Sequence, residues 1–143
     1  MRLWWRIRGA RLTIGVRALV FDDQQRVCLV RHSYRDGWFL PGGGVQTGES
    51  LVDAMTRELR EETGIKPMLN SHRVHGVYSS FAEHKSDHVV VFLITDWERE
   101  RGASTEIAEC RFVDPDDLPE DVSPATERRI KEWITGAPTG HRW

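Results

Sequence analysis

The chain has 143 residues, a length that suits one domain (residues 1–143) and leaves no room for a second. Its formal net charge of −2 gives no global basic field, so a DNA partner is not expected. Cys28 and Cys110 are too few for a disulfide scaffold, and we expect two isolated core thiols. Every apolar run is far too short to span a bilayer, so we expect a cytoplasmic protein without a membrane partner.

The N-terminal part of the sequence predicts an arm followed by a β-hairpin. Residues 1–12 are basic and contain Trp4 and Trp5, which suggests an arm or strand that packs on the domain, with a homodimer contact as the alternative. Residues 13–21 read as a strand, and residues 26–31 are expected to be its hairpin partner across a short polar turn.

Residues 50–63 predict one helix. Ser50 or Glu49 can begin it, because either side chain can bind free backbone N–H groups. Gly64 ends it as a residue that readily adopts the left-handed conformation. Apolar residues recur at helical spacing and define one face: Leu51, Ala54, Met55 and Leu59.

Two glutamates of this helix fall on its apolar face. Glu58 and Glu62 are four residues apart and lie inside the arc of the apolar side chains, with Glu61 at its edge. A solvated, salt-bridged face is the ordinary interpretation of such a charged run, but carboxylates drawn toward a core are costly unless they are paired or bind metal. Carboxylates without His or Cys suit a hard cation, so we predict a Mg²⁺ or Mn²⁺ site.

The turn before the helix is rich in glycine. Gly42, Gly43 and Gly44 follow Pro41 and let the backbone approach the glutamates closely. A carbonyl of this turn, assigned to Gly43, is a candidate metal ligand, and the N–H groups of Gly42 and Gly44 are candidates for binding phosphate oxygens.

The remaining sequence predicts further strands, a last helix and a tail. Residues 67–80 predict one or two strands, and residues 88–97 are the clearest buried strand. Residues 106–113 predict another strand. Residues 124–135 predict a helix with Pro124 in its first turn, and residues 136–143 are expected to be a loose tail.

The segment from residue 43 to residue 65 resembles the signature of the Nudix hydrolase family. All of the fixed positions match: Gly43, Glu49, Arg57, Glu58, Leu59, Glu61, Glu62, Gly64 and Ile65. The resemblance implies an α/β fold, an α/β/α sandwich with a mixed sheet. It also implies metal-dependent hydrolysis of a nucleoside diphosphate linked to another group.

The resemblance further implies roles for individual residues. Glu58 and Glu62 would be the main metal ligands, and Glu61 a ligand or the catalytic base. Arg57 would orient a catalytic carboxylate through a pair with Glu49. Glu106 resembles a glutamate that supplies a further ligand or the base in this family, with Glu109 as the alternative for that position. The choice of base stays open among the three glutamates 61, 62 and 106.

The substrate is less well defined by the sequence. The sequence marks of the ADP-ribose, dinucleoside polyphosphate and coenzyme A subgroups are not met. A small nucleoside di- or triphosphate is the favoured substrate, with Arg31 as a candidate phosphate contact and Trp38, Tyr78 or Phe81 for base stacking. Two alternatives are kept: a non-catalytic nucleotide-sensing module, since fold does not fix function, and a 5′-RNA pyrophosphohydrolase.

Overall fold

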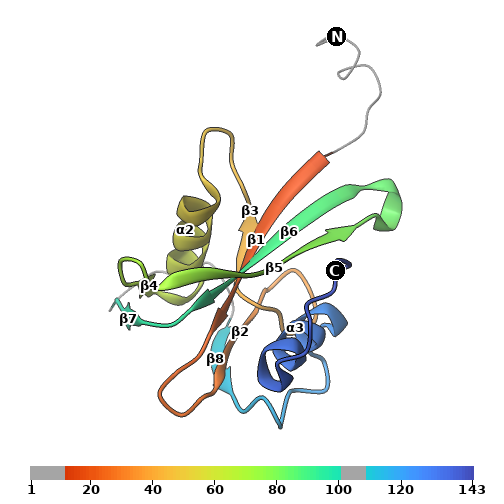
Figure 1. Cartoon of the computed structure of the whole chain (residues 1–143). Coiled ribbons are helices and arrows are strands. Elements are labelled where there is room, and N and C mark those ends of the chain that lie inside the picture. Colours follow the sequence, from red (N-terminus) through yellow and green to blue (C-terminus); the bar gives the residue numbers. More distant parts are fainter. Residues whose placement is uncertain (1–11, 101–108) are drawn as a thin grey trace.

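The computed structural model describes residues 12–100 and 109–143, where a mixed sheet lies between two helices (Figure 1). The strand order in the main sheet is β3-β1-β6-β5. β1 runs parallel to β6, while β3 and β5 are antiparallel to their neighbours. The strands are β1 (Leu12–Val20), β3 (Gly42–Gly44), β5 (His72–Ser80) and β6 (Ser86–Ile94). The α/β/α architecture is confirmed.

Two strand pairs and a short 3₁₀ helix complete the described elements. β2 (Val27–Arg31) pairs with β8 (Glu109–Val113), and β4 (Ile65–Pro67) pairs with β7 (Trp97–Arg99). The 3₁₀ helix η1 (Ala82–His84) connects β5 to β6.

The predicted hairpin between residues 13–21 and residues 26–31 is wrong. Both edges of β1 are occupied, by β3 and by a nine-residue parallel ladder with β6. A single bridge between Phe21 and Val27 joins the end of β1 to β2, whose ladder partner is β8. β1 and β2 are consecutive in the sequence, but apart from this single bridge they pair with different strands.

Both predicted helices form with the expected caps. In α2 (Leu51–Thr63) the Ser50 hydroxyl accepts a hydrogen bond from the Asp53 N–H, and Gly64 follows in the left-handed conformation at φ 74°. In α3 (Pro124–Thr135) Ser123 is the N-cap, and Pro124 occupies the first turn, where a missing N–H costs nothing.

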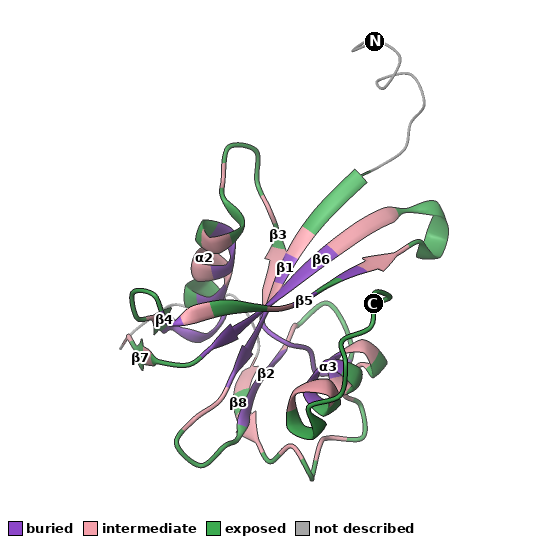
Figure 2. Ribbon diagram, viewed as in Figure 1, coloured by how far each residue is buried: buried purple, intermediate pink, exposed green. Residues whose placement is uncertain are grey.

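The core has two parts, one on each face of the sheet (Figure 2). On one face α2 buries Ala54, Met55 and Leu59 against β1 and β6. On the other face Ile130 of α3 packs with Trp38 and other large side chains. Because α2 covers the sheet with the same arc that carries Glu58 and Glu62, these carboxylates are held at the edge of the core.

The end of the chain is docked on the sheet. The Ser79 N–H donates to the His141 carbonyl at 2.8 Å, and the Trp143 N–H donates to the Ser79 carbonyl at 3.0 Å. The Trp143 ring contacts Tyr78 edge-on. Residues 136–143 are therefore not the loose tail that the sequence suggested. The predicted arm, residues 1–12, lies outside the described residues except for Leu12 of β1.

The two thiols lie together across the β2–β8 pair. The Sγ atoms of Cys28 and Cys110 are 3.4 Å apart, so the expectation of isolated thiols does not hold. Hydrogen bonding from Cys28 lowers the pKa of Cys110 to about 7, and the same pairing raises the pKa of Cys28. None of the described helices is long and apolar enough to cross a membrane.

Candidate active site

The glycine turn of β3 lies directly against the last half of α2. The Gly42 N–H donates to Oε1 of Glu62 at 2.9 Å. A Cβ atom on Gly43 would come within 2.5 Å of Oε1 of Glu58. Glycine is required here because the carboxylates occupy the space of a side chain, as the sequence predicted for this turn.

Glu62 is a buried carboxylate with an incomplete set of partners. Its side chain is 1% exposed, and its Oε2 atom has no hydrogen-bond partner among the described residues. Burial, then the neighbouring Glu58, raises the pKa of Glu62 to about 8, against smaller opposing effects of the Gly42 N–H and Arg17. Glu58 and Glu62 therefore lie close together, and Glu62 stays protonated to a higher pH than a free carboxyl group.

Arg57 organises the exposed side of this acidic pair. Its guanidinium donates to both oxygens of Glu49, at 2.7 and 2.9 Å, and to Oε1 of Glu58 at 2.9 Å. It also donates to the Gly44 carbonyl at 3.1 Å, which ties the helix to the turn. The hydrogen bonds from Arg57 lower the pKa of Glu49 to about 2. The expected Arg57–Glu49 pair is present.

The other candidate acids are less constrained. Glu61 is 60% exposed, and its nearest charged partner is Nη1 of Arg57 at 3.6 Å. Glu106 lies outside the described residues. Gly64 ends the helix as expected, and its N–H donates to the Arg60 carbonyl. The acids therefore differ in burial and contacts: Glu62 is buried and hydrogen-bonded to Gly42, whereas Glu61 is mostly exposed.

His32, which the sequence places on the approach to Trp38, is a further member of the site. Its Nε2 atom lies 3.7 Å from Oε2 of Glu62, and its Nδ1 atom is buried without a partner among the described residues. Burial and the nearby Arg17 and Arg35 lower the pKa of His32. The sequence indicates only that His32 follows a strand. The solvent-exposed residues next to it follow the same strand, so this position does not distinguish His32 from them.

The acidic pair fits a divalent cation. Glu58 and Glu62 offer hard oxygen atoms, and one of these, Oε2 of Glu62, has no hydrogen-bond partner among the described residues. A cation bound at this pair would lower the raised pKa of Glu62, because its positive charge favours the ionised carboxylate. In the part of the chain that the structure describes, no group of three or more His, Cys, Asp or Glu side chains is arranged to hold an ion by itself. Backbone carbonyls, water or substrate oxygens would complete the coordination, as is usual for Mg²⁺.

A basic cleft of about 550 Å³ is connected to this pair through Arg17; neither glutamate lines the cleft itself. Arg17 lines this cleft, and the negative charges of Glu58 and Glu62 act on its guanidinium. The cleft runs between β1, the end of β5, the start of α3 and the docked C-terminal segment. Its charged and aromatic lining residues are Arg17, Arg35, Phe39, Glu83, Lys85, Asp87, Arg128 and Trp143. Cations outnumber acids, so the cleft suits an anionic ligand.

The predicted stacking residues lie elsewhere than expected. Trp38 is 1% exposed, with the guanidinium of Arg31 4.5 Å from its ring centre, and Tyr78 is fully buried, donating to Glu132 at 2.6 Å. The expectation that these two rings stack on a base therefore does not hold in this structure. Phe81, by contrast, is half exposed next to the cleft.

Arg31 is occupied by local partners. Its guanidinium forms ion pairs with Asp121 at 3.3 Å and with Glu109 at 3.8 Å, besides covering Trp38. Arg31 is not among the residues that line the cleft. The cleft cations are therefore different residues from the one that the sequence suggested.

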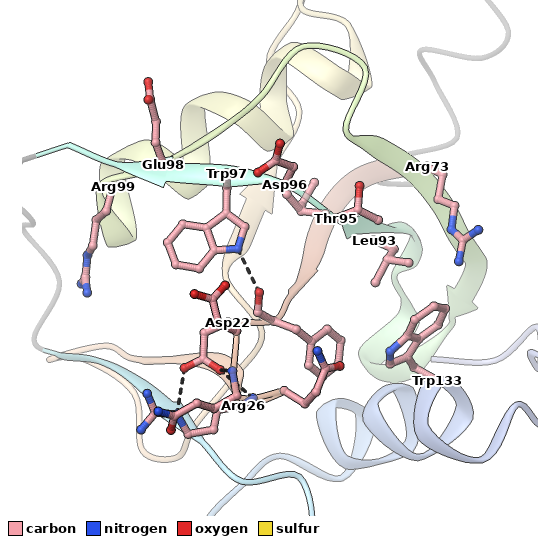
Figure 3. A pocket seen from close by; sticks show the side chains of 15 residues that line it. Asp22, Arg26, Arg73, Leu93, Thr95, Asp96, Trp97, Glu98, Arg99 and Trp133 are labelled. Atoms are coloured by element: carbon pink, nitrogen blue, oxygen red, sulfur yellow. Dashed lines mark hydrogen bonds and ion pairs between the residues drawn. The ribbon is translucent and has the colours of Figure 1, made fainter.

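A second hollow, of about 680 Å³, lies beyond the far end of β1 (Figure 3). Its wall includes Trp97, whose indole N–H donates to the Phe21 carbonyl, and Asp22, which is already paired with Arg26 at 2.8 Å. Arg73 points in from the opposite side, over the Trp133 ring. This hollow has mixed charges and lacks the acidic pair.

Comparisons with known proteins agree with this geometry. A protein-family model described as NUDIX domain matches residues 11–134. A protein of Bacillus subtilis named "Putative 8-oxo-dGTP diphosphatase" is 33% identical over 125 residues, covering 87% of this chain and 82% of that protein. An ADP-ribose pyrophosphatase of Methanocaldococcus jannaschii is 31% identical over 120 residues, covering 80% and 69%.

Solved structures share the architecture. A MutT NUDIX hydrolase from Burkholderia pseudomallei has a TM-score of 0.71 and 23% sequence identity, covering 85% of this chain and 97% of that one. The likeness to this solved structure shows the fold alone. The family model and the two relatives match most of the chain at the level of sequence.

Proposed function

The chain belongs to the Nudix hydrolase family, and from this premise we propose that it is a divalent-metal-dependent pyrophosphohydrolase of a small nucleoside di- or triphosphate. One observation carries the proposal: the buried Glu62 and the neighbouring Glu58 lie against a glycine turn, and the Gly42 carbonyl of this turn accepts a hydrogen bond from Arg17, which lines a basic cleft. This arrangement brings a site for a hard cation next to a site for phosphate.

In this proposal Glu58 and Glu62 hold Mg²⁺ or Mn²⁺, helped by the Gly43 carbonyl. The cation, when bound, neutralises phosphate oxygens and lowers the pKa of a coordinated water. Arg57 fixes Glu58 in place through its two bonds to Glu49. The Gly42 N–H fixes one oxygen of Glu62 and leaves the other free for the cation.

Glu61 is the base that the geometry favours among the described glutamates. A base takes a proton from the attacking water, so its carboxylate must be available to that water. Glu62 is held by the Gly42 N–H and Glu58 by Arg57, whereas Glu61 has only the 3.6 Å contact to Arg57. Replacement by Gln tests this: E61Q should lose turnover with little change in KM.

The cleft supports a small nucleotide as the substrate class. Arg17 and Arg35 face the cleft and suit phosphate, and Phe39 and Trp143 provide ring surface for a base. The names of the two relatives, an 8-oxo-dGTP diphosphatase and an ADP-ribose pyrophosphatase, indicate nucleotides of this size. The expected cytoplasmic location and the homodimer remain predictions.

The test is product release from a panel of nucleoside di- and triphosphates, nucleotide sugars, ADP-ribose and 5′-triphosphorylated RNA. Mg²⁺, Mn²⁺ and EDTA are the three conditions. We expect metal-dependent hydrolysis of one nucleotide class, lost by about a hundredfold in Glu62→Gln. Glu127→Gln is the matched control, because it makes the same chemical change at a partly exposed glutamate of α3 that is paired with Lys131.

The outcomes separate the alternatives. Turnover that persists in EDTA, or equal activity of Glu62→Gln and Glu127→Gln, would contradict the metal site. Nucleotide binding without hydrolysis across the whole panel would instead favour the nucleotide-sensing module. Hydrolysis confined to the RNA substrate would favour the 5′-RNA pyrophosphohydrolase.

A further inference from the structure

We propose that Arg17 holds a phosphate group of the substrate at the junction between the cleft and the Glu58/Glu62 pair. This inference rests on the proposed function for its substrate class, and it adds a residue that lies outside the signature segment. Arg17 is in the middle of β1, and its Cα lies opposite Gly42 in the ladder between β1 and β3.

Contacts with the glycine turn hold the Arg17 side chain in place. Its Nη1 atom donates to the Leu40 carbonyl at 2.9 Å and, at 3.4 Å, to the Gly42 carbonyl. The turn is pressed against this residue, because a Cβ on Gly42 would overlap the Val16 carbonyl and lie 2.8 Å from Cα of Arg17. The guanidinium is therefore pre-positioned beside the turn.

Most of the donors of Arg17 remain available. A guanidinium has five N–H donors, and the bonds formed within the described residues use Nη1 alone. Neither Nε nor Nη2 is among the buried polar atoms that lack a partner. Because Arg17 also lines the cleft, these remaining donors face a space that a ligand can enter.

The charges around Arg17 favour an anion at this point. Arg17 and Arg35 repel each other, and no carboxylate lies within ion-pair distance (4.0 Å) of either guanidinium among the described residues. Glu58 and Glu62 attract Arg17 from the other side, where the cation is proposed to bind. A phosphate placed between Arg17 and a bound cation would compensate both positive charges.

The experiment measures binding of inorganic tripolyphosphate, pyrophosphate and phosphate in EDTA by calorimetry. Without metal, hydrolysis does not contribute. A charge-assisted hydrogen bond is worth roughly tenfold or more in affinity, so Arg17→Gln should weaken tripolyphosphate binding by about tenfold. Arg73→Gln, which removes the same charge at the distant second hollow, should leave the affinity unchanged.

Two results would overturn the inference. Parental tripolyphosphate affinity in Arg17→Gln, with turnover reduced through kcat alone, would show that Arg17 only shapes the turn. The unaltered protein gives an independent measurement, in which the NMR signal of the Arg17 side-chain Nε–H should shift on adding tripolyphosphate. An unmoved signal would contradict the proposal even if the variant failed to fold.

These measurements distinguish this inference from the proposed function. Arg17-dependent binding of tripolyphosphate together with a silent hydrolysis panel would retain the phosphate site and remove the hydrolase. Metal-dependent hydrolysis together with Arg17-independent binding would do the reverse.

Discussion

Replacing Glu62 by Gln should make the metal-free protein more stable at alkaline pH while removing its activity. The folded protein raises the pKa of Glu62 from 4.5 to about 8, mainly because the carboxylate is buried. A carboxyl group whose pKa is raised on folding stabilises the fold fully below its unfolded pKa, and this contribution is lost as pH rises toward the folded pKa. The loss for Glu62 therefore falls between about pH 4.5 and pH 8.

The size of the effect follows from the shift. At about 1.36 kcal/mol per pKa unit, the ionised Glu62 side chain costs on the order of 4 to 5 kcal/mol above pH 8. That is a large part of the stability of an ordinary domain, typically about 5 to 15 kcal/mol. Gln at this position is neutral at every pH, and its amide oxygen can still accept from the Gly42 N–H.

The assay is urea unfolding in EDTA at several pH values between 5 and 9. We expect the free energy of unfolding of the parent to fall relative to Glu62→Gln as pH rises, and Mg²⁺ to restore the parent alone. Glu127→Gln serves as the control and should follow the parent. Parallel pH profiles for the parent and Glu62→Gln would refute the reasoning, because they would show that Glu62 ionises without cost.

Three further predictions test other contacts of the site and the core. Arg57→Lys keeps the charge but loses the two-pronged contact with Glu49, so kcat should fall by about ten- to a hundredfold in steady-state assays with little change in KM. Trp143→Ala removes part of the cleft wall and should raise the nucleotide Kd by roughly two- to tenfold in calorimetry, whereas unchanged affinity would place the ligand elsewhere. Cys110 should react with iodoacetamide with a midpoint near pH 7, and Cys28→Ala should raise that midpoint because the thiol donor to Cys110 is removed; mass spectrometry of labelled protein gives both values.

Local features of the chain were predictable from the sequence because their causes are local. The caps Ser50 and Gly64 bond to residues within the same helix, and the positions of Glu58 and Glu62 on its buried arc follow from helical periodicity. The close approach of the glycine turn was also predictable, because three consecutive glycines permit little else.

Features that depend on strand pairing were not predictable in this way. Arg17 enters the site through its register with Gly42, and His32 through a turn that follows β2. From the sequence, Trp38 and Tyr78 were expected to be accessible for base stacking. In the structure, side chains from distant strands and from α3 cover both rings. A single sequence contains no direct signal for such long-range contacts, so the acidic side of the site was predictable and its basic side was not.

The pairing of β1 also determines when the chain can fold. β1 joins β6 through nine register positions, from Leu12 opposite Ser86 to Val20 opposite Ile94, and its only other ladder within the described residues is the short one with β3. On the ribosome, β1 has no long partner until residue 94 has left the exit tunnel. Pairing of β1 with β6 therefore closes a long loop, and pairings of such high contact order form slowly. Until then an apolar strand stays open, so a nascent chain stalled before β6 would be prone to aggregation.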